Sequence, residues 1–202
     1  MKGWLYLFVF SAIPVFFIFI LLSKPALWVW WLALFGTTLN LLSWIKLCLY
    51  FRKDFPNLPL LVKAAVIAIS VKIALQVFIC IPAVGEWTFA NRNLIIGYVH
   101  LLSLGCIMPL ILDQFTKRGF LVADRHLSII NGLFIFAVGI YLGFLFMQPL
   151  LAYFYILIPG YQLLLLIVSL LFLLIGILYF IKIKISPIIV SKVSPLSSLP
   201  NV

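Results

Sequence analysis

Charged residues are scarce in this chain. They make up 9% of its 202 residues, and only four of them are acidic. A typical soluble domain carries about a quarter charged residues, so the composition excludes an ordinary water-soluble domain. The acids are Asp54, Glu86, Asp113 and Asp124, and each lies between apolar runs or at the end of one. No pair of carboxylates is therefore available inside an apolar run for acid–base chemistry.

Cysteine and histidine are also sparse. Cys48, Cys80 and Cys106 each stand alone in an apolar run, with no C-x-x-C pairing, which indicates small buried hydrophobes. His100 and His126 are the only histidines. The H-E-x-x-H, G-x-S-x-G, Walker and dinucleotide-binding glycine patterns are missing. These absences favour a protein without catalytic activity, although they leave the question open.

Long apolar runs dominate what is present, since 66% of the residues are hydrophobic. Runs of about 20 residues can cross a hydrocarbon core of about 30 Å as helices, and these runs are apolar all round. We predict an all-α bundle of about six transmembrane helices, over residues 4–22, 26–51, 60–84, 94–112, 127–147 and 161–181. Segment 148–160 is too short to cross and is expected to lie in the interface or to re-enter. The tail, residues 182–202, is rich in Ser and Pro and is predicted to be disordered.

Lysine and arginine are sorted between the two ends of these helices. Six passes place both termini on one side, which receives Lys2, Lys46, Arg52, Lys53, Lys63, Lys117, Arg118, Arg125, Lys182, Lys184 and Lys192. The other side receives Lys24 and Arg92. By the positive-inside rule both termini are cytoplasmic, and we predict a multi-pass protein of the bacterial inner membrane. The same rule accounts for the net charge of +10, so we predict contact with the lipid bilayer and no binding of nucleic acid.

A few polar residues fall inside the predicted spans. Lys72 lies near the middle of the third span, where a lysine costs about 2.5–3.5 kcal/mol on insertion scales. Asn40, Gln76, His100 and Ser103 lie at comparable depth on the second, third and fourth spans. With no acid in these spans, Lys72 is either neutral, or held by neighbouring dipoles, or paired with a ligand anion, a lipid phosphate or another subunit. The polar layer is either a ligand or partner site or a cluster that joins the helices.

We hypothesise that Lys72 and His100 line one polar cavity, because consecutive antiparallel spans are usually neighbours. His100 is the one candidate metal ligand within a span. His126 lies at the other end of the bundle, so a haem or metal would need a second chain to supply further ligands. Ser103 follows His100 by three residues, but no acid is placed to orient a serine–histidine dyad.

Glycines in the fifth predicted span offer a packing signal. Gly139 and Gly143 form a G-x-x-x-G step, and Gly132 shares their face. Such small residues let membrane helices approach closely. The alternative is that these glycines reflect only the ordinary composition of membrane helices.

About 40 residues of the chain resemble a known group of proteins. They are residues 71–76, Ile81-Pro82 and residues 91–105, and the most specific part is Gly97-Tyr98-Val99-His100-Leu101. This stretch resembles the later half of an uncharacterised group of multi-span proteins from Bacteroidota. That group is itself distantly akin to haem-copper oxidase subunit I and to denitrification-associated membrane proteins. The resemblance implies that His100 inherits the position of a metal or haem ligand. A haem-copper centre needs several histidines on different helices, so the resemblance implies lineage without the oxygen chemistry.

Two functions follow from these observations. The first is an accessory membrane subunit, whose polar layer binds a partner helix, a lipid or a haem-bearing protein. The second is a redox or transport protein in which His100 and Lys72 handle a metal, haem, a proton or an anion. The sequence does not identify a cofactor.

Overall fold

The computed structural model describes residues 2–15, 17 and 27–193 of the chain. This part of the chain is helical almost throughout and contains no strand. Its elements in order are α1 (Lys2–Val15), α2 (Leu27–Phe51), η2 (Phe55–Asn57), α3 (Leu60–Ile79), α4 (Pro82–Ala90), α5 (Arg92–His100), η3 (Leu101–Ile107), α6 (Met108–Lys117), α7 (Arg125–Tyr153) and α8 (Tyr161–Val193).

Five helices are long and apolar enough to cross a membrane, which confirms five of the predicted spans as long apolar helices. They are Trp28–Phe51, Leu60–Ile79, Arg92–Lys117, Arg125–Tyr153 and Tyr161–Lys184. The third of these, the Arg92–Lys117 helix, is α5, η3 and α6 joined end to end. For the first predicted span, α1 covers Lys2–Val15, and most of its remainder lies outside the described residues.

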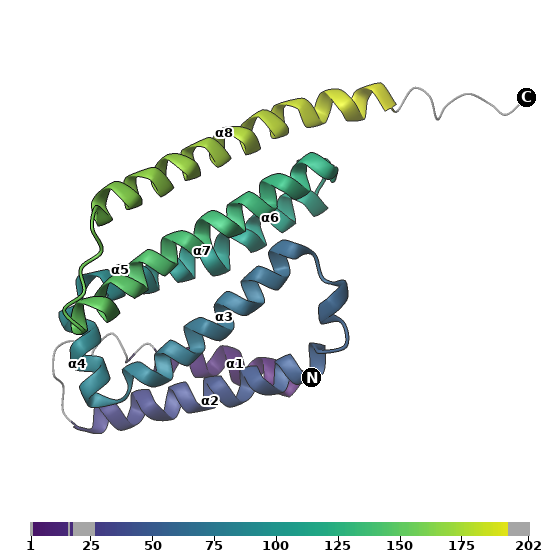
Figure 1. The fold of residues 1–202 in the computed structure, drawn as a ribbon. Coiled ribbons are helices and arrows are strands. Elements are labelled where there is room, and N and C mark those ends of the chain that lie inside the picture. Colours follow the sequence, from purple (N-terminus) through teal and green to yellow (C-terminus); the bar gives the residue numbers. More distant parts are fainter. Residues whose placement is uncertain (1, 16, 18–26, 194–202) are drawn as a thin grey trace, which may run out of the picture.

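The helices pack in chain order into an antiparallel array (Figure 1). α1 packs on α2, α2 on α3, and α3 on the Arg92–Lys117 helix through η3 and α6. α7 then packs on α5, and α8 packs along α7. α2 and α3 diverge toward the right in Figure 1, where the turn that holds η2 joins them, whereas α3 approaches α6 and α7 on that side.

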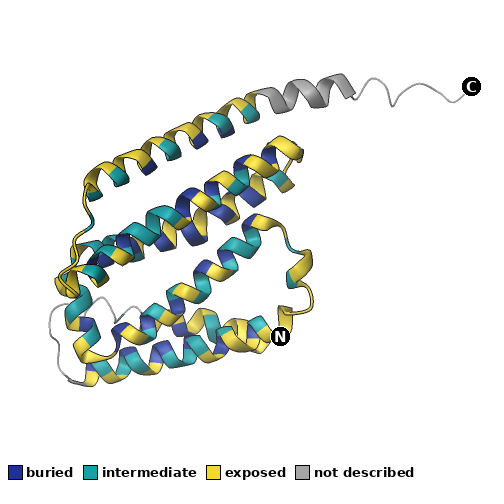
Figure 2. Ribbon diagram, in the orientation of Figure 1, coloured by how far each residue is buried: buried dark blue, intermediate teal, exposed yellow. Residues whose placement is uncertain are grey.

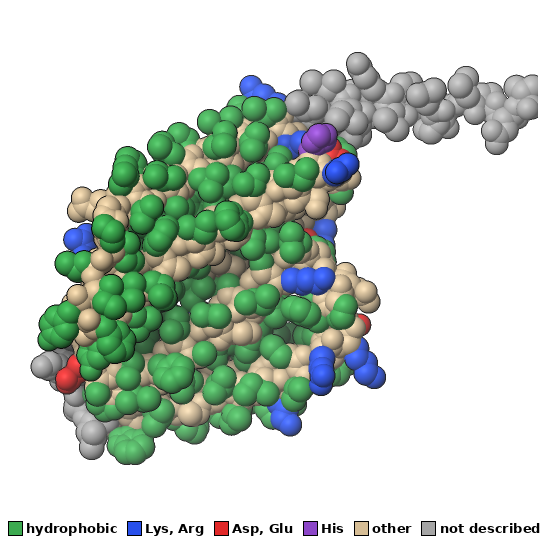
Figure 3. Space-filling model, in the orientation of Figure 1, with side chains coloured by type: hydrophobic (Ala, Val, Ile, Leu, Met, Phe, Trp, Pro, Cys, Tyr) green, Lys and Arg blue, Asp and Glu red, His purple; other side chains and the backbone are tan. Residues whose placement is uncertain are grey.

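One end of the array carries most of the basic side chains. Lys2 begins α1 at this end, and Lys46 near the end of α2 lies 5.9 Å from the centre of the Trp4 ring. Lys182 of α8 pairs there with Asp124, which precedes α7. The space-filling view shows most Lys and Arg side chains along the right-hand edge, over a mainly apolar face (Figure 3). We call this the basic end of the bundle.

The outward-facing surface of the bundle is apolar. Large hydrophobic side chains such as Phe10, Trp31, Phe136 and Leu173 are more than 60% exposed, and exposed residues follow the outer side of every long helix (Figure 2). Small and polar residues are instead buried between helices, among them Ala33, Thr37 and Ser43. This arrangement reverses that of a water-soluble bundle.

Close approaches between helices occur at glycines other than those predicted. A Cβ atom added to Gly36 would lie 2.8 Å from Pro14, and one added to Gly105 would lie 3.1 Å from the Cβ of Ala68. A Cβ atom added to Gly132, Gly139 or Gly143 would meet nothing within 4 Å. Within the described residues no helix therefore packs closely on these three glycines, and the packing role predicted for them stays a prediction. Gly139 and Gly143 instead line a cavity between α3 and α7.

Two predicted boundaries also differ. α7 continues through the buried Pro149 to Tyr153, so half of segment 148–160 belongs to this helix and a short connection follows. α8 continues to Val193, so residues 182–193 are helical, whereas residues 194–202 lie outside the described part. The bond between Lys182 and Asp124 holds the beginning of this extension against α7. The polar loop predicted between the third and fourth spans contains the short helix α4.

Candidate functional site

His100 lies where the Arg92–Lys117 helix changes its winding. α5 ends at His100, and residues Leu101–Ile107 form the π-helix η3. Pro109 explains this change, because it lacks an N–H group and its ring would clash with the carbonyl of Gly105 in an α-helix. In the wider turn the Met108 N–H donates to the Ser103 carbonyl, five residues back. Such turns are frequent at functional sites.

The hydrogen bonds of His100 fix its tautomer. Its Nδ1 lies 2.8 Å from the Ile96 carbonyl oxygen. Because a carbonyl oxygen only accepts, Nδ1 must carry the proton and donate it. In the neutral ring Nε2 is then an acceptor, and no described residue donates a hydrogen bond to it. His100 therefore offers a lone pair that is oriented by the backbone of its own helix.

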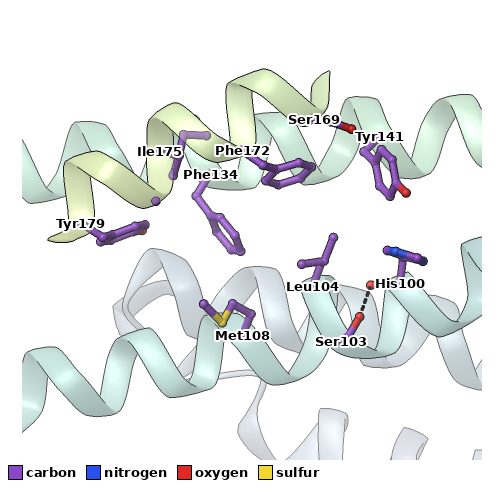
Figure 4. Close-up of a pocket in the computed structure, with 11 residues that line it drawn as sticks. His100, Ser103, Leu104, Met108, Phe134, Tyr141, Ser169, Phe172, Ile175 and Tyr179 are labelled. Atoms are coloured by element: carbon purple, nitrogen blue, oxygen red, sulfur yellow. Dashed lines mark hydrogen bonds between the residues drawn. The ribbon is translucent and has the colours of Figure 1, made fainter. Parts of the chain in front are cut away.

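The His100 side chain lines a cavity of about 450 Å³ between the Arg92–Lys117 helix, α7 and α8 (Figure 4). Tyr141 of α7 lies on the opposite wall, and its ring meets the His100 ring edge to face with centroids 5.2 Å apart. Phe172 of α8 packs against Tyr141 at 5.8 Å. The other lining residues are Ser103, Leu104, Met108, Phe134, Ser169, Ile175, Gly176 and Tyr179. We call this space the His100 cavity.

The hydroxyl groups around the His100 cavity differ in how they are satisfied. Ser103 donates to the Val99 carbonyl at 3.1 Å, and Ser169 donates to the Leu165 carbonyl at 2.9 Å. Tyr179 donates to Asn131 Oδ1 at 2.7 Å. The Tyr141 hydroxyl makes no hydrogen bond with any described residue, although its ring packs against His100 and Phe172. The cavity thus presents one free acceptor, on His100, and one free donor, on Tyr141.

Lys72 and Gln76 do not line the His100 cavity. Gln76 is buried on α3 beside the Tyr98 hydroxyl of α5, and its Oε1 has no partner among the described residues. Lys72 is half-buried and lies near Cys106 of η3. These four residues form a polar cluster between α3 and the Arg92–Lys117 helix. The hypothesis of one cavity shared by Lys72 and His100 is therefore not supported, because the two residues face different neighbours.

Asn40 lies apart from both the His100 cavity and the polar cluster. Its Nδ2 donates to Ser11 Oγ at 2.8 Å and to the Phe8 carbonyl at 3.3 Å. Both acceptors lie on α1, so Asn40 joins α1 to α2. This contact is the helix-joining role that the sequence left open for the polar layer.

Three residues of these sites, Tyr141, Tyr98 and Ser169, were not predicted from the sequence, and Cys106 was predicted only as a small hydrophobe. A signal for the tyrosines was available, because a tyrosine far from both ends of an apolar run needs a partner for its hydroxyl. No group of three or more His, Cys, Asp or Glu side chains within the described ranges is placed to hold a metal ion. His100 can thus supply only one ligand.

Comparison with protein-family models, with curated proteins and with solved structures gives no match for the chain.

Proposed function

We propose that the chain is a multi-pass protein of the bacterial inner membrane, with six passes and with the basic end in the cytoplasm. Five long apolar helices, an apolar exterior and buried polar residues support the membrane location. α1 would be the first part of a sixth pass, since it begins at the basic end and packs along α2. The clustering of Lys and Arg at one end supports the orientation.

We also propose that this protein acts as an accessory, ligand-binding membrane protein, whose His100 cavity takes an apolar molecule carrying a hydroxyl group. The observation that carries this proposal is the facing pair of unsatisfied groups, His100 Nε2 and the Tyr141 hydroxyl. A single hydroxyl group can donate to Nε2 and accept from Tyr141 at the same time. A cavity of about 450 Å³ lies in the range of small-molecule sites, which are mostly apolar with a few placed polar groups.

The residues that line the His100 cavity restrict the class of ligand that it can bind. Phe134, Phe172 and Tyr141 give the His100 cavity aromatic walls, and no acid or lysine lines it. A charged ligand would remain unpaired there at a large cost in desolvation. Long-chain alcohols, isoprenoid alcohols and hydroxylated rings share the required chemistry.

The test compares farnesol with farnesyl methyl ether, which keeps the chain but cannot donate. Both are added to the purified protein in nanodiscs, and the melting temperature is measured. We expect farnesol to stabilise the protein more than the ether, because one neutral hydrogen bond contributes about 0.5–1.5 kcal/mol. The difference should vanish in His100→Phe and persist in His126→Phe, which changes a histidine outside the cavity. Equal stabilisation of the unmodified protein by both compounds would refute the proposal.

A second function is favoured by the tautomer of His100. Histidines that bind a metal usually donate their other ring N–H to a carbonyl or carboxylate, and His100 donates to the Ile96 carbonyl in this way. His100 would then be one axial ligand of a haem whose second ligand comes from another chain. The visible spectrum of the protein purified from membranes separates the two functions. A Soret band that is lost in His100→Ala supports haem, and a colourless protein rejects it.

A further inference from the structure

α3 has an apolar cavity on each of two sides, and both cavities are separate from the His100 cavity. One lies between α3 and α7 and holds about 500 Å³. The other lies between α2 and α3 and holds about 600 Å³. Both are lined by Phe55, Ile67 and Val71. Ile67 and Val71 are exposed, so they form a ridge on α3 that separates two grooves.

The groove between α3 and α7 has the length of one membrane leaflet. It follows α3 from Leu60 to Val71, which is about 17 Å at 1.5 Å per residue. Half of a hydrocarbon core is about 15 Å. Gly139 and Gly143 widen the groove on the α7 side, because no side chain stands there.

The groove between α2 and α3 is closed at a similar depth. It extends along α3 to Ser70 and Val71. There Trp44 of α2 donates from Nε1 to Ser70 Oγ at 2.9 Å. Along α3, both grooves therefore begin at the basic end and stop at Val71, near the middle of that helix.

Each groove has a basic residue at its mouth. Lys63 lines the α3–α7 groove and Arg52 lines the α2–α3 groove. Lys63 donates one hydrogen to the Pro56 carbonyl at 2.7 Å and retains two more. Neither residue forms an ion pair with an acid in the described part of the chain. These two cations at the rim of apolar grooves are complementary to an anionic head group with acyl chains.

We propose that α3 forms the binding site of an anionic phospholipid with two acyl chains, from the cytoplasmic leaflet. One acyl chain lies in each groove, the ridge of Ile67 and Val71 stands between them, and the phosphate binds Lys63 and Arg52. The inference rests on the proposed membrane location and orientation, but it is independent of the His100 cavity.

The experiment is native mass spectrometry of the protein released from nanodiscs. The nanodiscs contain equal amounts of phosphatidylglycerol and phosphatidylcholine with identical acyl chains. We expect one phosphatidylglycerol retained per protein, at least fivefold over phosphatidylcholine. The double variant Arg52→Gln, Lys63→Gln should lose this preference. Lys53→Gln, which removes a neighbouring charge that lines neither groove, should keep it.

A second variant tests the acyl chains. Gly139→Leu fills the α3–α7 groove and should reduce retention of phosphatidylglycerol, while its melting temperature shows that the protein remains folded. Equal retention of both lipids by the unmodified protein would overturn the proposal, and so would an unchanged preference in the double variant. Failure of the membrane location would be seen separately, as protein released from membranes by alkaline carbonate.

Discussion

The rings of His100 and Tyr141 meet edge to face across the His100 cavity, with centroids 5.2 Å apart. Replacing His100 by phenylalanine keeps this aromatic contact and removes the unsatisfied Nε2. We expect His100→Phe to lower the free energy of unfolding by no more than about 0.5–1.5 kcal/mol, because the variant loses one neutral hydrogen bond, from Nδ1 to the Ile96 carbonyl. Melting in detergent measures this. A larger loss of stability would show that Nε2 also has a donor, and therefore an occupant, already in the purified protein.

Lys72 carries the largest insertion cost in α3. Lys72→Met should raise membrane insertion of the isolated third span, because it removes about 2.5–3.5 kcal/mol of cost. Lys46→Met, near the end of α2, should have a much smaller effect, since that lysine reaches the interface. Both are measured by translocon-dependent insertion of single helices. If Lys72→Met instead prevented folding of the whole chain, Lys72 would be needed to hold its cluster with Gln76, Tyr98 and Cys106.

Gly36 and Gly132 differ in how closely another helix approaches them, so the same substitution at each position tests the packing of the helices. Gly36→Ala places a methyl group 2.8 Å from Pro14 and should destabilise the contact of α1 with α2 by about 1–3 kcal/mol. Gly132→Ala meets nothing within 4 Å and should stabilise α7 by about 0.5–1 kcal/mol. Thermal melting of both variants checks the signs. Destabilisation by Gly132→Ala would point to a partner helix on that face of α7.

Asp124 makes the free energy of unfolding depend on pH in the acidic range. A hydrogen bond from Lys182, and next the amide of Leu127, hold the pKa of Asp124 below its ordinary value, which is about 3.9. Because the folded pKa is lowered, the ionised carboxylate stabilises the fold above that ordinary value. This contribution is lost as the pH falls through the folded pKa.

Asp124→Asn tests this dependence, because asparagine still caps α7 but cannot form the ion pair with Lys182. We expect the variant to melt at a lower temperature at pH 7 and to lose less on acidification below about pH 4. Asp54→Asn serves as the control, since the Asp54 side chain makes no capping bond. Parallel acid profiles of the wild type and Asp124→Asn would contradict the assignment.

The long helices could be predicted from the sequence because length and apolarity alone decide them. The beginnings of α2, α3 and α8 agree with prediction to within a residue. The places of His100 and Lys72 along their helices followed in the same way, since these depend only on counting residues.

The directions in which these side chains point could not be predicted. A helix that is apolar all round has no hydrophobic face to fix its rotation, so packing decides which residues meet. His100 turns toward Tyr141 and α8, whereas Tyr98 turns toward Gln76 on α3. The G-x-x-x-G step is limited in the same way, because it gives no information on which face another helix covers.

The wide turn at residues 101–107 has a consequence beyond the cavity. Relative to an α-helix such a turn holds about one surplus residue, which rotates everything after it by roughly 100° about the helix axis. The rotation of α6 about its axis decides which of its residues are buried. Leu112 and Asp113 are buried, and Asp113 pairs with Lys117 at 2.6 Å. Deleting a single residue from the turn would swing that carboxylate out of its present environment, about 14 Å from the deletion. The position of the basic end of this helix against its neighbours is thus set by an irregularity near the centre of the helix.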